Sequence, residues 1–398
     1  MTSPKQLVLL GATGSIGDST LKVCRQHPER LRVAGIAGNR RWRALAPIAR
    51  EFGVRHVCVF DEPSCAQARD SGEFPPETVF YCGLDGLTEL ACLDGADTVV
   101  AAVVGTISLR PALAALNCGK HLALASKELL VMAGKFVTDA ARANGCDILP
   151  LDSEHNAIFQ CLHGEDHGGV DRIILTASGG PFRDFTAAQM RTITKAQALK
   201  HPNWDMGPKV TIDSSTMANK GLEVIEAHWL FGLLRERIGV VVHPQSIVHS
   251  MVQYVDGSIV AQLSPPHMCF AIQHALLHPH RAAGCVPTLD FSEVVRLEFR
   301  PPDYERFPCL RLAMEAMEAG GAAPAVFNAA NEAAVEAFVA EQIHYLDIAA
   351  VIEATLDAVA AVEPQSLDEV LAVDTRARRV AAEIAADRAG GAPSFATA

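Results

Sequence analysis

The chain has 398 residues, of which 49% are hydrophobic and 20% charged, so we expect a globular enzyme of two or three domains and not a disordered chain. Its formal net charge of −12 at pH 7 argues against a nucleic-acid partner or an anionic-membrane partner. No apolar run reaches the roughly 18 residues that span a bilayer, and the first residues lack a signal-peptide pattern, which favours a cytoplasmic protein.

Strand and helix patterns alternate through the first 151 residues. Apolar runs predict strands at Lys5–Leu10, Leu31–Ala37, His56–Phe60, Thr98–Val104, His121–Ala125 and Cys146–Leu151. Helical spacing is found at Asp18–Arg25, Arg43–Phe52, Leu109–Asn117 and Lys127–Asn144. This alternation is typical of a parallel, doubly wound sheet. We therefore predict an α/β fold whose first domain, residues 1–150, is Rossmann-like and binds a dinucleotide.

The pattern changes after residue 151. Further strands are predicted at Arg172–Ala177, Ile238–Val242, Ser246–Val255 and Ser258–Leu263, the last two as a hairpin around Asp256-Gly257. The rest of the chain is predicted to form a central α+β catalytic domain over 151–277, a proline-containing linker over 278–303 and a C-terminal helical domain over 304–390. Residues 389–398 are expected to fray.

The eleven cysteines are scattered, odd in number and without a Cys-x-x-Cys pair. Such usage is typical of small buried hydrophobic residues in a reducing compartment. We therefore expect neither disulfides nor a zinc site.

A glycine-rich segment, Gly11-Ala-Thr-Gly14-Ser-Ile-Gly17, follows the first strand and opens a helix. Glycines let a backbone approach a pyrophosphate, and a helix N-terminus supplies N–H donors. The alternative is a tight structural turn.

The second strand ends at Gly38-Asn39-Arg40-Arg41, where an NAD enzyme usually has an acid. Two guanidinium groups suit a 2′-phosphate, so this segment favours NADP as the cofactor. The alternative is that both arginines are solvated residues at the start of a helix.

An acidic pair, Asp152 and Glu154, follows the last predicted strand of the first domain. Residues i and i+2 of an extended strand point the same way, so both carboxylates can face one point. Oxygen ligands suit Mg²⁺ or Mn²⁺, which indicates a metal beside the nicotinamide. The alternative is two solvated acids at a strand end.

Polar and glycine residues gather in the central domain, around Ser178, His201, Ser214, Asn219 and Lys220. Hydroxyl, amide and ammonium donors are what a phosphate monoester needs. Glu223 is spaced to share a helix face with Asn219 and Lys220, where it can supply a third metal carboxylate. Trp204 and Met206 are interpreted either as core anchors or as a lid that excludes water.

The chain resembles the 1-deoxy-D-xylulose 5-phosphate reductoisomerase family in eight sequence motifs. These motifs occur in the same order over almost the whole length of the chain. These are Gly14-Ser-Ile-Gly17, Ser126-Lys-Glu128, Leu151-Asp-Ser-Glu-His-Asn-Ala-Ile-Phe159, Ser178-Gly-Gly-Pro-Phe182, His201-Pro-Asn-Trp204, Asn219-Lys-Gly-Leu-Glu223, His243-Pro-Gln-Ser246 and Asn328-Ala-Ala-Asn-Glu332. The resemblance implies a V-shaped subunit, a flexible lid and a homodimer.

The resemblance also implies residue roles. The NADPH contacts would be Thr13, Gly14, Ser15, Ile16, Gly38, Asn39, Arg40, Ser126, Glu128 and Gly207. The catalytic set would be Lys127 with the Mg²⁺ or Mn²⁺ ligands Asp152, Glu154 and Glu223. The substrate contacts would be Lys127, Ser153, Glu154, Ser178, His201, Trp204, Met206, Ser214, Asn219, Lys220 and Glu223.

The implied reaction is the rearrangement of the sugar phosphate, by retroaldol cleavage or by a ketol shift, and its reduction to 2-C-methyl-D-erythritol 4-phosphate in isoprenoid precursor synthesis. The chain departs from the family pattern in three places. Ser126 replaces an Asn, Ala177 replaces a Gly, and Ser264-Pro-Pro-His267-Met268 replaces a Gly-x-Pro-Asp-Met lid. These departures concern contacts to the nicotinamide and the lid.

Two rival functions share the first domain. A metal-independent NADP reductase of the homoserine or dihydrodipicolinate type has no need for three carboxylates, and chelation would not abolish its activity. A non-enzymatic NADP-sensing scaffold would bind the cofactor without turnover, and it leaves the clustered phosphate donors without a role.

Overall fold

The computed structural model describes residues 3–103, 105–204, 206–292 and 296–389. The chain divides into two compact units. Unit 1 consists of Met1–Leu129, Lys135–Phe159 and His267–Leu289, and unit 2 of Leu130–Gly134, Gln160–Pro266 and Asp290–Ala398. Val104, the last residue of a predicted strand, and residues 390–398, which hold most of the predicted frayed end, lie outside the described residues.

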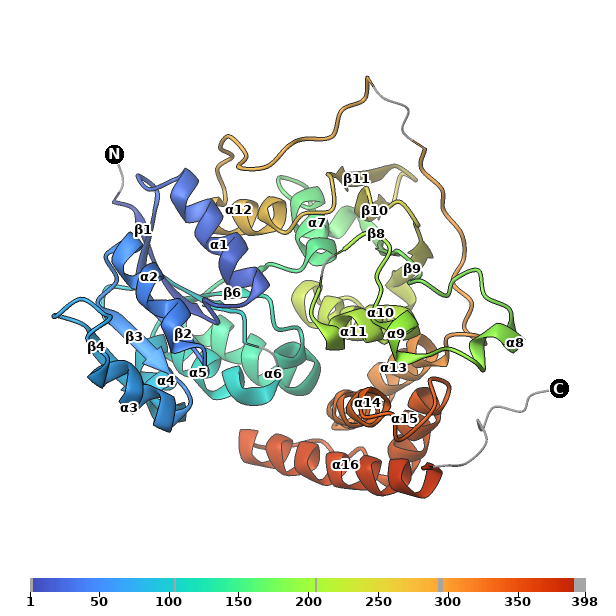
Figure 1. Cartoon of the computed structure of the whole chain (residues 1–398). Helices are drawn as coiled ribbons and strands as arrows, with labels where there is room; N and C mark the ends of the chain where they lie inside the picture. The colour runs from blue at the N-terminus through green and yellow to red at the C-terminus, as the bar shows by residue number, and fades with distance from the viewer. Residues whose placement is uncertain (1–2, 104, 205, 293–295, 390–398) are drawn as a thin grey trace. The chain divides into compact units, whose positions relative to one another are not determined.

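Unit 1 is built on a parallel seven-stranded sheet in the order β4-β3-β2-β1-β5-β6-β7 (Figure 1). Its strands are β1 (Lys5–Leu10), β2 (Leu31–Gly38), β3 (His56–Val59), β4 (Val79–Cys82), β5 (Thr98–Ala101), β6 (His121–Leu124) and β7 (Ile148–Pro150). The strand order reverses between β1 and β5, and ligands of such sheets bind outside the carboxyl ends at this point. The predicted Rossmann-like sheet is confirmed.

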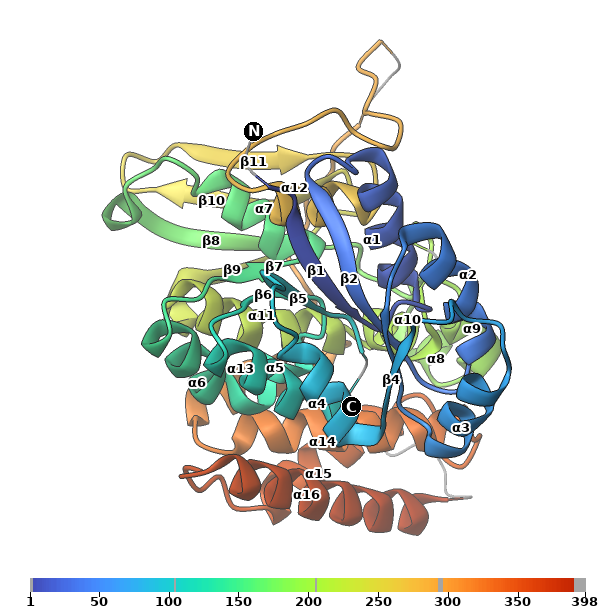
Figure 2. The ribbon, with the colours of Figure 1, turned by 90° about the vertical axis from the view of Figure 1, so that its left-hand side faces the viewer.

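Helices cover both faces of this sheet. The helices that lie wholly or mostly in unit 1 are α1 (Ser15–Gln26), α2 (Trp42–Phe52), α3 (Glu62–Asp70), α4 (Gly83–Ala91), α5 (Leu109–Asn117), α6 (Glu128–Ala143, except Leu130–Gly134), α7 (Ser153–Cys161) and α12 (Cys269–Leu277), with the 3₁₀ turn η1 (Thr106–Ser108). Figure 2 shows α1, α2 and α3 on one side of the sheet and α4 and α5 on the other. The sequence pattern did not predict α3, β4 or α4; β4 has only four residues and is a partly exposed edge strand.

The predicted extended conformation of Asp152 and Glu154 is wrong. Strand β7 ends at Pro150, and α7 begins at Ser153. The Oδ1 atom of Asp152 accepts a hydrogen bond of 3.0 Å from the backbone N–H of Glu154, as an N-cap residue does. Aspartate is among the strongest N-cap residues, and an acid in the first helical turn is favoured by the helix dipole. Local capping therefore ends the strand before the acidic pair.

Unit 2 contains a four-stranded mixed sheet in the order β11-β10-β8-β9. Its strands are β8 (Val170–Ala177), β9 (Ile238–Val242), β10 (Val248–Tyr254) and β11 (Ile259–Leu263). Strands β10 and β11 pair antiparallel, which confirms the predicted hairpin, while β8 and β9 pair in parallel.

The helices of unit 2 are α8 (Ala187–Met190), α9 (Lys195–Ala198), α10 (Pro208–Thr216), α11 (Ala218–Phe231), α13 (Pro308–Ala319), α14 (Ala323–Val339), α15 (Asp347–Ala358) and α16 (Leu367–Arg388), with the 3₁₀ turns η2 (His167–Gly169) and η3 (Arg235–Arg237). In Figures 1 and 2, α13 to α16 form a helical layer that contacts α10 and α11. The predicted helical C-terminal region is confirmed. No helix among the described residues is both long and apolar enough to cross a membrane.

The segment that follows α12 is irregular. The described residues of 278–303 contain no helix or strand apart from an isolated bridge between Arg300 and Val242. Helix α12 belongs to unit 1, where Lys5 Nζ donates to Leu276 O at 3.0 Å. The predicted domain boundaries at residues 150, 277 and 303 stay a prediction.

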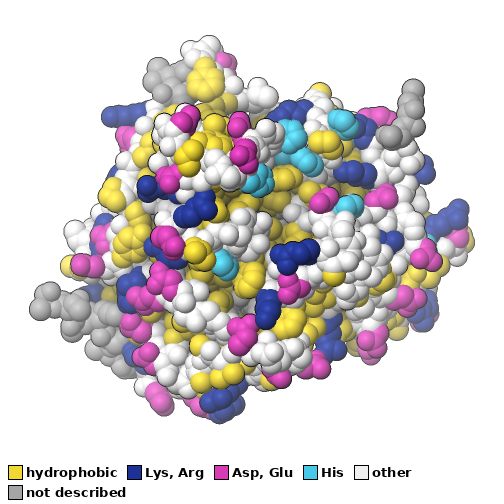
Figure 3. Space-filling model, turned by 180° about the vertical axis from the view of Figure 1, so that it is seen from behind, with side chains coloured by type: hydrophobic (Ala, Val, Ile, Leu, Met, Phe, Trp, Pro, Cys, Tyr) yellow, Lys and Arg dark blue, Asp and Glu magenta, His cyan; other side chains and the backbone are white. Residues whose placement is uncertain are grey.

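Surface charge is mixed over the face shown in Figure 3, where Lys and Arg side chains lie between Asp and Glu side chains. The net charge of −12 is therefore not gathered into one acidic field on this face.

One cysteine pair contradicts the expectation of no disulfides. Cys65 on α3 and Cys82 at the end of β4 form a disulfide with their Cα atoms 5.9 Å apart, and the other nine cysteines are free. The two residues are 17 positions apart. They meet because α3 packs against β4, neither of which was identified from the sequence.

His243 is a buried residue of unit 2 whose two ring nitrogens both form hydrogen bonds to the backbone. Its Nδ1 atom lies 2.8 Å from Glu298 O, and its Nε2 atom accepts the backbone N–H groups of Ile247 and Val248 at 3.1 and 3.2 Å. Nε2 is therefore unprotonated and Nδ1–H donates, which is the neutral form of the ring. Burial lowers the pKa of His243. The hydrogen bond to the backbone of Glu298 acts in the opposite direction, and the neighbouring His249 lowers the pKa further.

We expect unit 2 to lose stability in mild acid through His243. Since the folded state lowers this pKa, the unfolded chain binds the proton more readily, so the contribution is full above about pH 6.5 and is lost as the pH falls below it. Urea unfolding of the wild type and of His243→Asn at pH 8 and pH 5.5 checks this. The variant should be less stable at pH 8 and show a smaller pH dependence; an unchanged pH dependence would contradict the assignment.

Candidate active site

The glycine-rich segment forms the turn between β1 and α1. Gly11 has a φ of +99°, and a Cβ atom there would lie 2.4 Å from Ala102 O. A Cβ on Gly17 would lie 2.4 Å from Gly11 O, so the turn admits no side chain at either position. Helix α1 begins after Gly14, which has no side chain to cap the first N–H groups. This leaves a backbone cradle of the kind that binds a phosphate.

The end of β2 lies beside this turn. Arg41 Nη2 donates to Thr13 O at 2.7 Å, which fixes the two loops against each other. Arg40 and Asn39 are exposed, and Arg40 Nε lies 3.2 Å from Asp61 Oδ1 in a pair whose arginine side chain is 80% exposed. Such an exposed pair is weak, so Arg40 can turn to an anionic ligand at little cost.

The other predicted cofactor residues lie at several places. Ser126, which follows β6, donates its hydroxyl to Val103 O at 2.5 Å beside the end of β5. The hydroxyl that replaces the family's Asn thus ties two strand ends together. Glu128 is buried at the start of α6. Gly207 precedes α10 and belongs to unit 2, so its role as a cofactor contact stays a prediction.

The carboxyl end of β7 carries a charged cluster in unit 1. Lys127 Nζ donates to Asp152 Oδ2 at 2.7 Å, and both side chains are about 90% buried, with exposures of 11% and 10%. His155 Nδ1 lies 3.2 Å from Asp152 Oδ1. Ser153 Oγ donates to Glu154 Oε2 at 2.6 Å. The structure thus brings Lys127, Ser153 and both acids of unit 1 together, and it adds His155, which the i,i+3 spacing from Asp152 could have indicated.

Unit 2 carries a second cluster on and before α10 and α11. Asn219 Nδ2 and Lys220 Nζ both donate to Glu223, one to each carboxylate oxygen. Lys220 and Glu223 are 4% and 1% exposed. The predicted shared face of Asn219, Lys220 and Glu223 is therefore present, and the ammonium group balances the buried carboxylate.

Ser178 and His201 form the next part of this cluster. Two backbone N–H groups, of Asn203 and Trp204, donate to His201 Nδ1 at 3.1 and 3.0 Å, so the ring proton of the neutral form lies on Nε2. Nε2 lies 3.0 Å from Ser178 Oγ, which also accepts the N–H of Gly180 at 3.2 Å. Since Ser178 Oγ accepts two hydrogen bonds, its own O–H is directed elsewhere and can donate to an anion.

The loop of Trp204 and Met206 contains no helix or strand among its described residues. Trp204 makes an edge-to-face contact with His249 of β10, with ring centroids 6.1 Å apart. Asn203 Nδ2 donates to Pro244 O at 2.6 Å and to Ser246 Oγ at 2.9 Å. The loop thus contacts β10 and the connection between β9 and β10, and the alternative of a lid stays a prediction.

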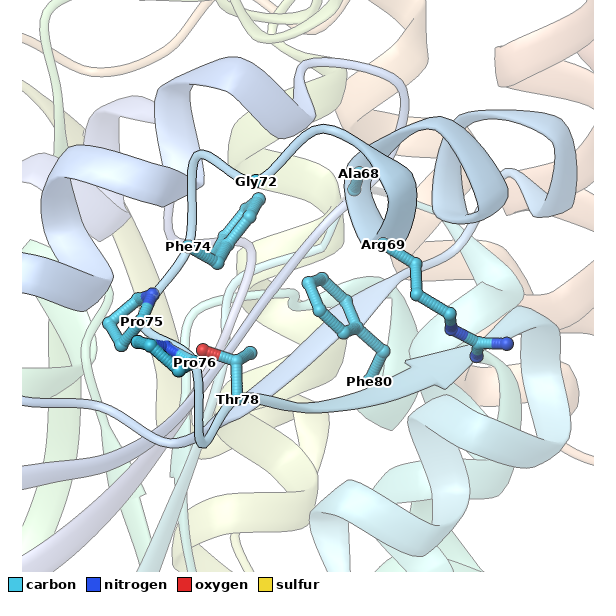
Figure 4. A pocket seen from close by; sticks show the side chains of 8 residues that line it. All are labelled: Ala68, Arg69, Gly72, Phe74, Pro75, Pro76, Thr78 and Phe80. Atoms are coloured by element: carbon cyan, nitrogen blue, oxygen red, sulfur yellow. The ribbon is translucent and has the colours of Figure 1, made fainter.

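A pocket of about 410 Å³ lies between α3 and β4. Figure 4 shows its lining residues, Ala68, Arg69, Gly72, Phe74, Pro75, Pro76, Thr78 and Phe80. None of the predicted site residues lines it, so it is not part of the candidate active site.

Three segments of the chain match models of a known protein family. Residues 7–134 match the family model of 1-deoxy-D-xylulose 5-phosphate reductoisomerase, and residues 148–231 match that of its C-terminal domain. Residues 263–380 match a further model, the DXP reductoisomerase C-terminal domain. Together these models cover both units.

Three proteins illustrate the similarity. The 1-deoxy-D-xylulose 5-phosphate reductoisomerase of Chlorobium chlorochromatii is 52% identical over 378 residues, which are 95% of this chain and 98% of that protein. The Zymomonas mobilis enzyme, solved in complex with NADPH, is 44% identical with a TM-score of 0.90, over 96% of this chain and 99% of that one. A DOX-P reductoisomerase solved with NADPH, fosmidomycin and magnesium is also 44% identical with a TM-score of 0.90, over 96% and 98%. The chain therefore belongs to the 1-deoxy-D-xylulose 5-phosphate reductoisomerase family.

Proposed function

We propose that this chain converts 1-deoxy-D-xylulose 5-phosphate to 2-C-methyl-D-erythritol 4-phosphate, with NADPH as reductant and Mg²⁺ or Mn²⁺ as a required metal. The observation that carries the proposal is the buried Lys127–Asp152 pair with Glu154, at the carboxyl edge of a sheet that also holds a phosphate-binding turn. A metal-independent reductase has no need for this carboxylate pair.

The proposed metal ligands, which membership of the family implies, are Asp152, Glu154 and Glu223. All three supply carboxylate oxygens, which are the ligands that hard divalent cations take. Lys127 and Lys220 each donate to one of these carboxylates, so they orient its oxygens. The donor chemistry fits Mg²⁺ and Mn²⁺ equally, and both stay in the proposal.

The proposed NADPH site uses the backbone cradle of Thr13, Gly14, Ser15 and Ile16 for the pyrophosphate. Gly38, Asn39 and Arg40 would contact the adenosine phosphate end, while Ser126, Glu128 and Gly207 would complete the site. The turn can pack this tightly because Gly11 and Gly17 have no Cβ atom, which would clash with the backbone of Ala102 and of the turn itself. Arg40 supplies the positive charge that a 2′-phosphate requires.

The proposed substrate site has two parts. Lys127, Ser153, Glu154 and Glu223 would face the oxygenated carbons, and the phosphate would be held by Ser178, His201, Ser214, Asn219 and Lys220. Trp204 and Met206 would exclude water from the reacting carbons. When bound, the metal polarises the ketone as a Lewis acid and the nicotinamide supplies hydride. Lys127 holds its ammonium proton beside Asp152, where it can stabilise oxyanion charge on the substrate.

We further propose that the enzyme is a homodimer in the cytoplasm. The homodimer is what membership of the family implies. Nine of the eleven cysteines are free thiols, which supports a reducing compartment, although the Cys65–Cys82 pair is an exception. Sedimentation of the purified protein at working concentration tests the dimer.

The direct test of the proposed function mixes the purified chain with NADPH, Mg²⁺ and 1-deoxy-D-xylulose 5-phosphate and follows nicotinamide absorbance. We expect NADPH oxidation that requires both substrate and metal. Activity that persists in excess chelator would favour the metal-independent reductase, and cofactor binding without turnover would favour the sensing scaffold.

Two neighbouring arginines offer a matched test of cofactor choice. Arg40→Ala should raise the KM for NADPH by roughly tenfold, since a charge-assisted contact is worth about 1.5–3 kcal/mol, and should leave kcat/KM for NADH nearly unchanged. Arg41 donates to Thr13 O in the phosphate turn, so Arg41→Ala should weaken both cofactors alike. Comparable kcat/KM values for NADPH and NADH in the wild type would rule out this site for the 2′-phosphate.

A further inference from the structure

Helix α10 carries Ser214, a proposed phosphate ligand. It spans nine residues, Pro208–Thr216, and helices this short are marginal in water without tertiary contacts. It ends at Met217, whose φ of 64° breaks the chain direction before α11 begins. The position of Ser214 therefore depends on what holds α10 in unit 2.

One contact comes from the loop of Ser178. A Cβ atom on Gly180 would lie 2.7 Å from Ser214 O and 2.9 Å from the Cα atom of Ser215. The loop backbone therefore lies directly on the last turn of α10. The loop that carries Ser178 therefore packs against the helix that carries Ser214. A shift of α10 would change the distance between these two proposed phosphate ligands.

Two further contacts come from the C-terminal helical region. Asn331 of α14 donates from Nδ2 to Asp213 Oδ1 at 3.0 Å, and the two residues are 0% and 1% exposed. Lys209 forms an ion pair with the other carboxylate oxygen of Asp213. The hydroxyl of Tyr345 donates to Ser215 O at 2.6 Å, and burial raises the pKa of this phenol, so it stays a neutral donor. The two bonded residues, Asp213 and Ser215, stand on either side of Ser214.

The amide of Asn331 satisfies the buried carboxylate of Asp213 through Nδ2, while its other polar atom is left unpaired within the described part of the chain. Its Oδ1 atom is buried and has no hydrogen-bond partner among the described residues. A buried unpaired carbonyl costs free energy that an aliphatic side chain of similar size would avoid. The benefit of an amide at this position is therefore the N–H that reaches Asp213.

We propose that Asn331 and Tyr345 are positioning residues of the substrate site, which hold α10 so that Ser214 and Ser178 are spaced for the substrate phosphate. The inference rests on the proposed function and deepens it, because it assigns the helical region a direct part in phosphate binding. Neither residue touches the substrate; both act through α10.

The test compares full-length Asn331→Leu and Tyr345→Phe with the wild type. The control is Glu336→Gln, which changes an exposed residue on the same helix as Asn331. Three quantities are measured: the KM for 1-deoxy-D-xylulose 5-phosphate, the KM for NADPH, and hydrogen exchange of the backbone N–H groups of α10, which residues 209–216 carry because Pro208 has none. Thermal midpoints report general destabilisation, and Tyr345→Phe, which removes one hydroxyl, covers the case in which Asn331→Leu fails to fold.

We expect the KM for the sugar phosphate to rise roughly tenfold in Asn331→Leu and several-fold in Tyr345→Phe, with the KM for NADPH within about twofold of the wild type. Exchange in residues 209–216 should rise in both variants and not in the control. An unchanged sugar-phosphate KM, or equal changes in both KM values with a lowered thermal midpoint, would overturn the inference. If the wild type does not turn over this substrate, the proposed function fails instead, and unchanged exchange in residues 209–216 would separately overturn the positioning role.

Discussion

Asp152→Asn should abolish most turnover while NADPH still binds. The substitution keeps the size of the side chain and its N-cap bond to Glu154, because Asn caps helices as well as Asp does. It removes one negative charge, and with it the ion pair to Lys127. Loss of an outer-sphere partner typically costs roughly 10–100-fold in metal affinity, so loss of a ligand should lower kcat by about a hundredfold or more.

The measurement is kcat as a function of Mg²⁺ concentration, together with NADPH binding by fluorescence. Asp166→Asn is the matched control, since Asp166 also caps a helical turn, with a bond of 2.9 Å from Gly168 N, but is exposed. A metal site predicts that excess Mg²⁺ restores part of the activity of Asp152→Asn. Near-normal turnover of this variant at low Mg²⁺ would rule out Asp152 as a ligand.

Lys220→Ala should lower kcat/KM for the phosphorylated substrate by roughly two orders of magnitude. A hydrogen bond to a charged group is worth about 1.5–3 kcal/mol, which is one to two orders of magnitude at about 1.4 kcal/mol per tenfold. The structure adds a second consequence, because Lys220 also pairs with the buried Glu223. Its removal would leave that carboxylate with one fewer partner.

Two substrates separate these roles. If Lys220 binds the phosphate, deoxyxylulose without phosphate should be a very poor substrate for the wild type, and Lys220→Ala should lower its kcat/KM by a much smaller factor than that of the phosphorylated substrate. If Lys220 acts on Glu223 alone, both substrates should lose activity by the same factor, and metal affinity should fall. Lys195→Ala, which removes another lysine paired with a glutamate in unit 2, is the control. Normal turnover of the phosphorylated substrate by Lys220→Ala would place the phosphate elsewhere.

Local pattern was enough for much of the fold. The alternation of strands and helices predicted the Rossmann-like sheet, and the turn residues Asp256 and Gly257 predicted the hairpin of β10 and β11. Both signals arise from residues close in the chain, where backbone preferences and side-chain alternation act directly. The same holds for Asn219, Lys220 and Glu223, whose spacing on one helix brings them together.

Local pattern was misleading where two local preferences compete. The alternation of Asp152 and Glu154 suits a strand, but Asp152 caps α7 instead. Strand β7 ends at Pro150, and the cap of α7 at Asp152 prevails over the strand pattern. The residues were therefore identified from the sequence, and their conformation was not.

Contacts between distant segments were decided by packing alone. Ser178 and His201 are 23 residues apart, and Asp213 and Asn331 are 118 apart. The chain entropy lost in closing such loops is recovered only when whole elements pack, so no spacing rule indicates which side chains will meet. The same reason explains the unexpected Cys65–Cys82 disulfide, which forms where α3 lies on β4. The sequence thus specified the chemistry of the candidate site, and tertiary packing specified the partners that hold it in place.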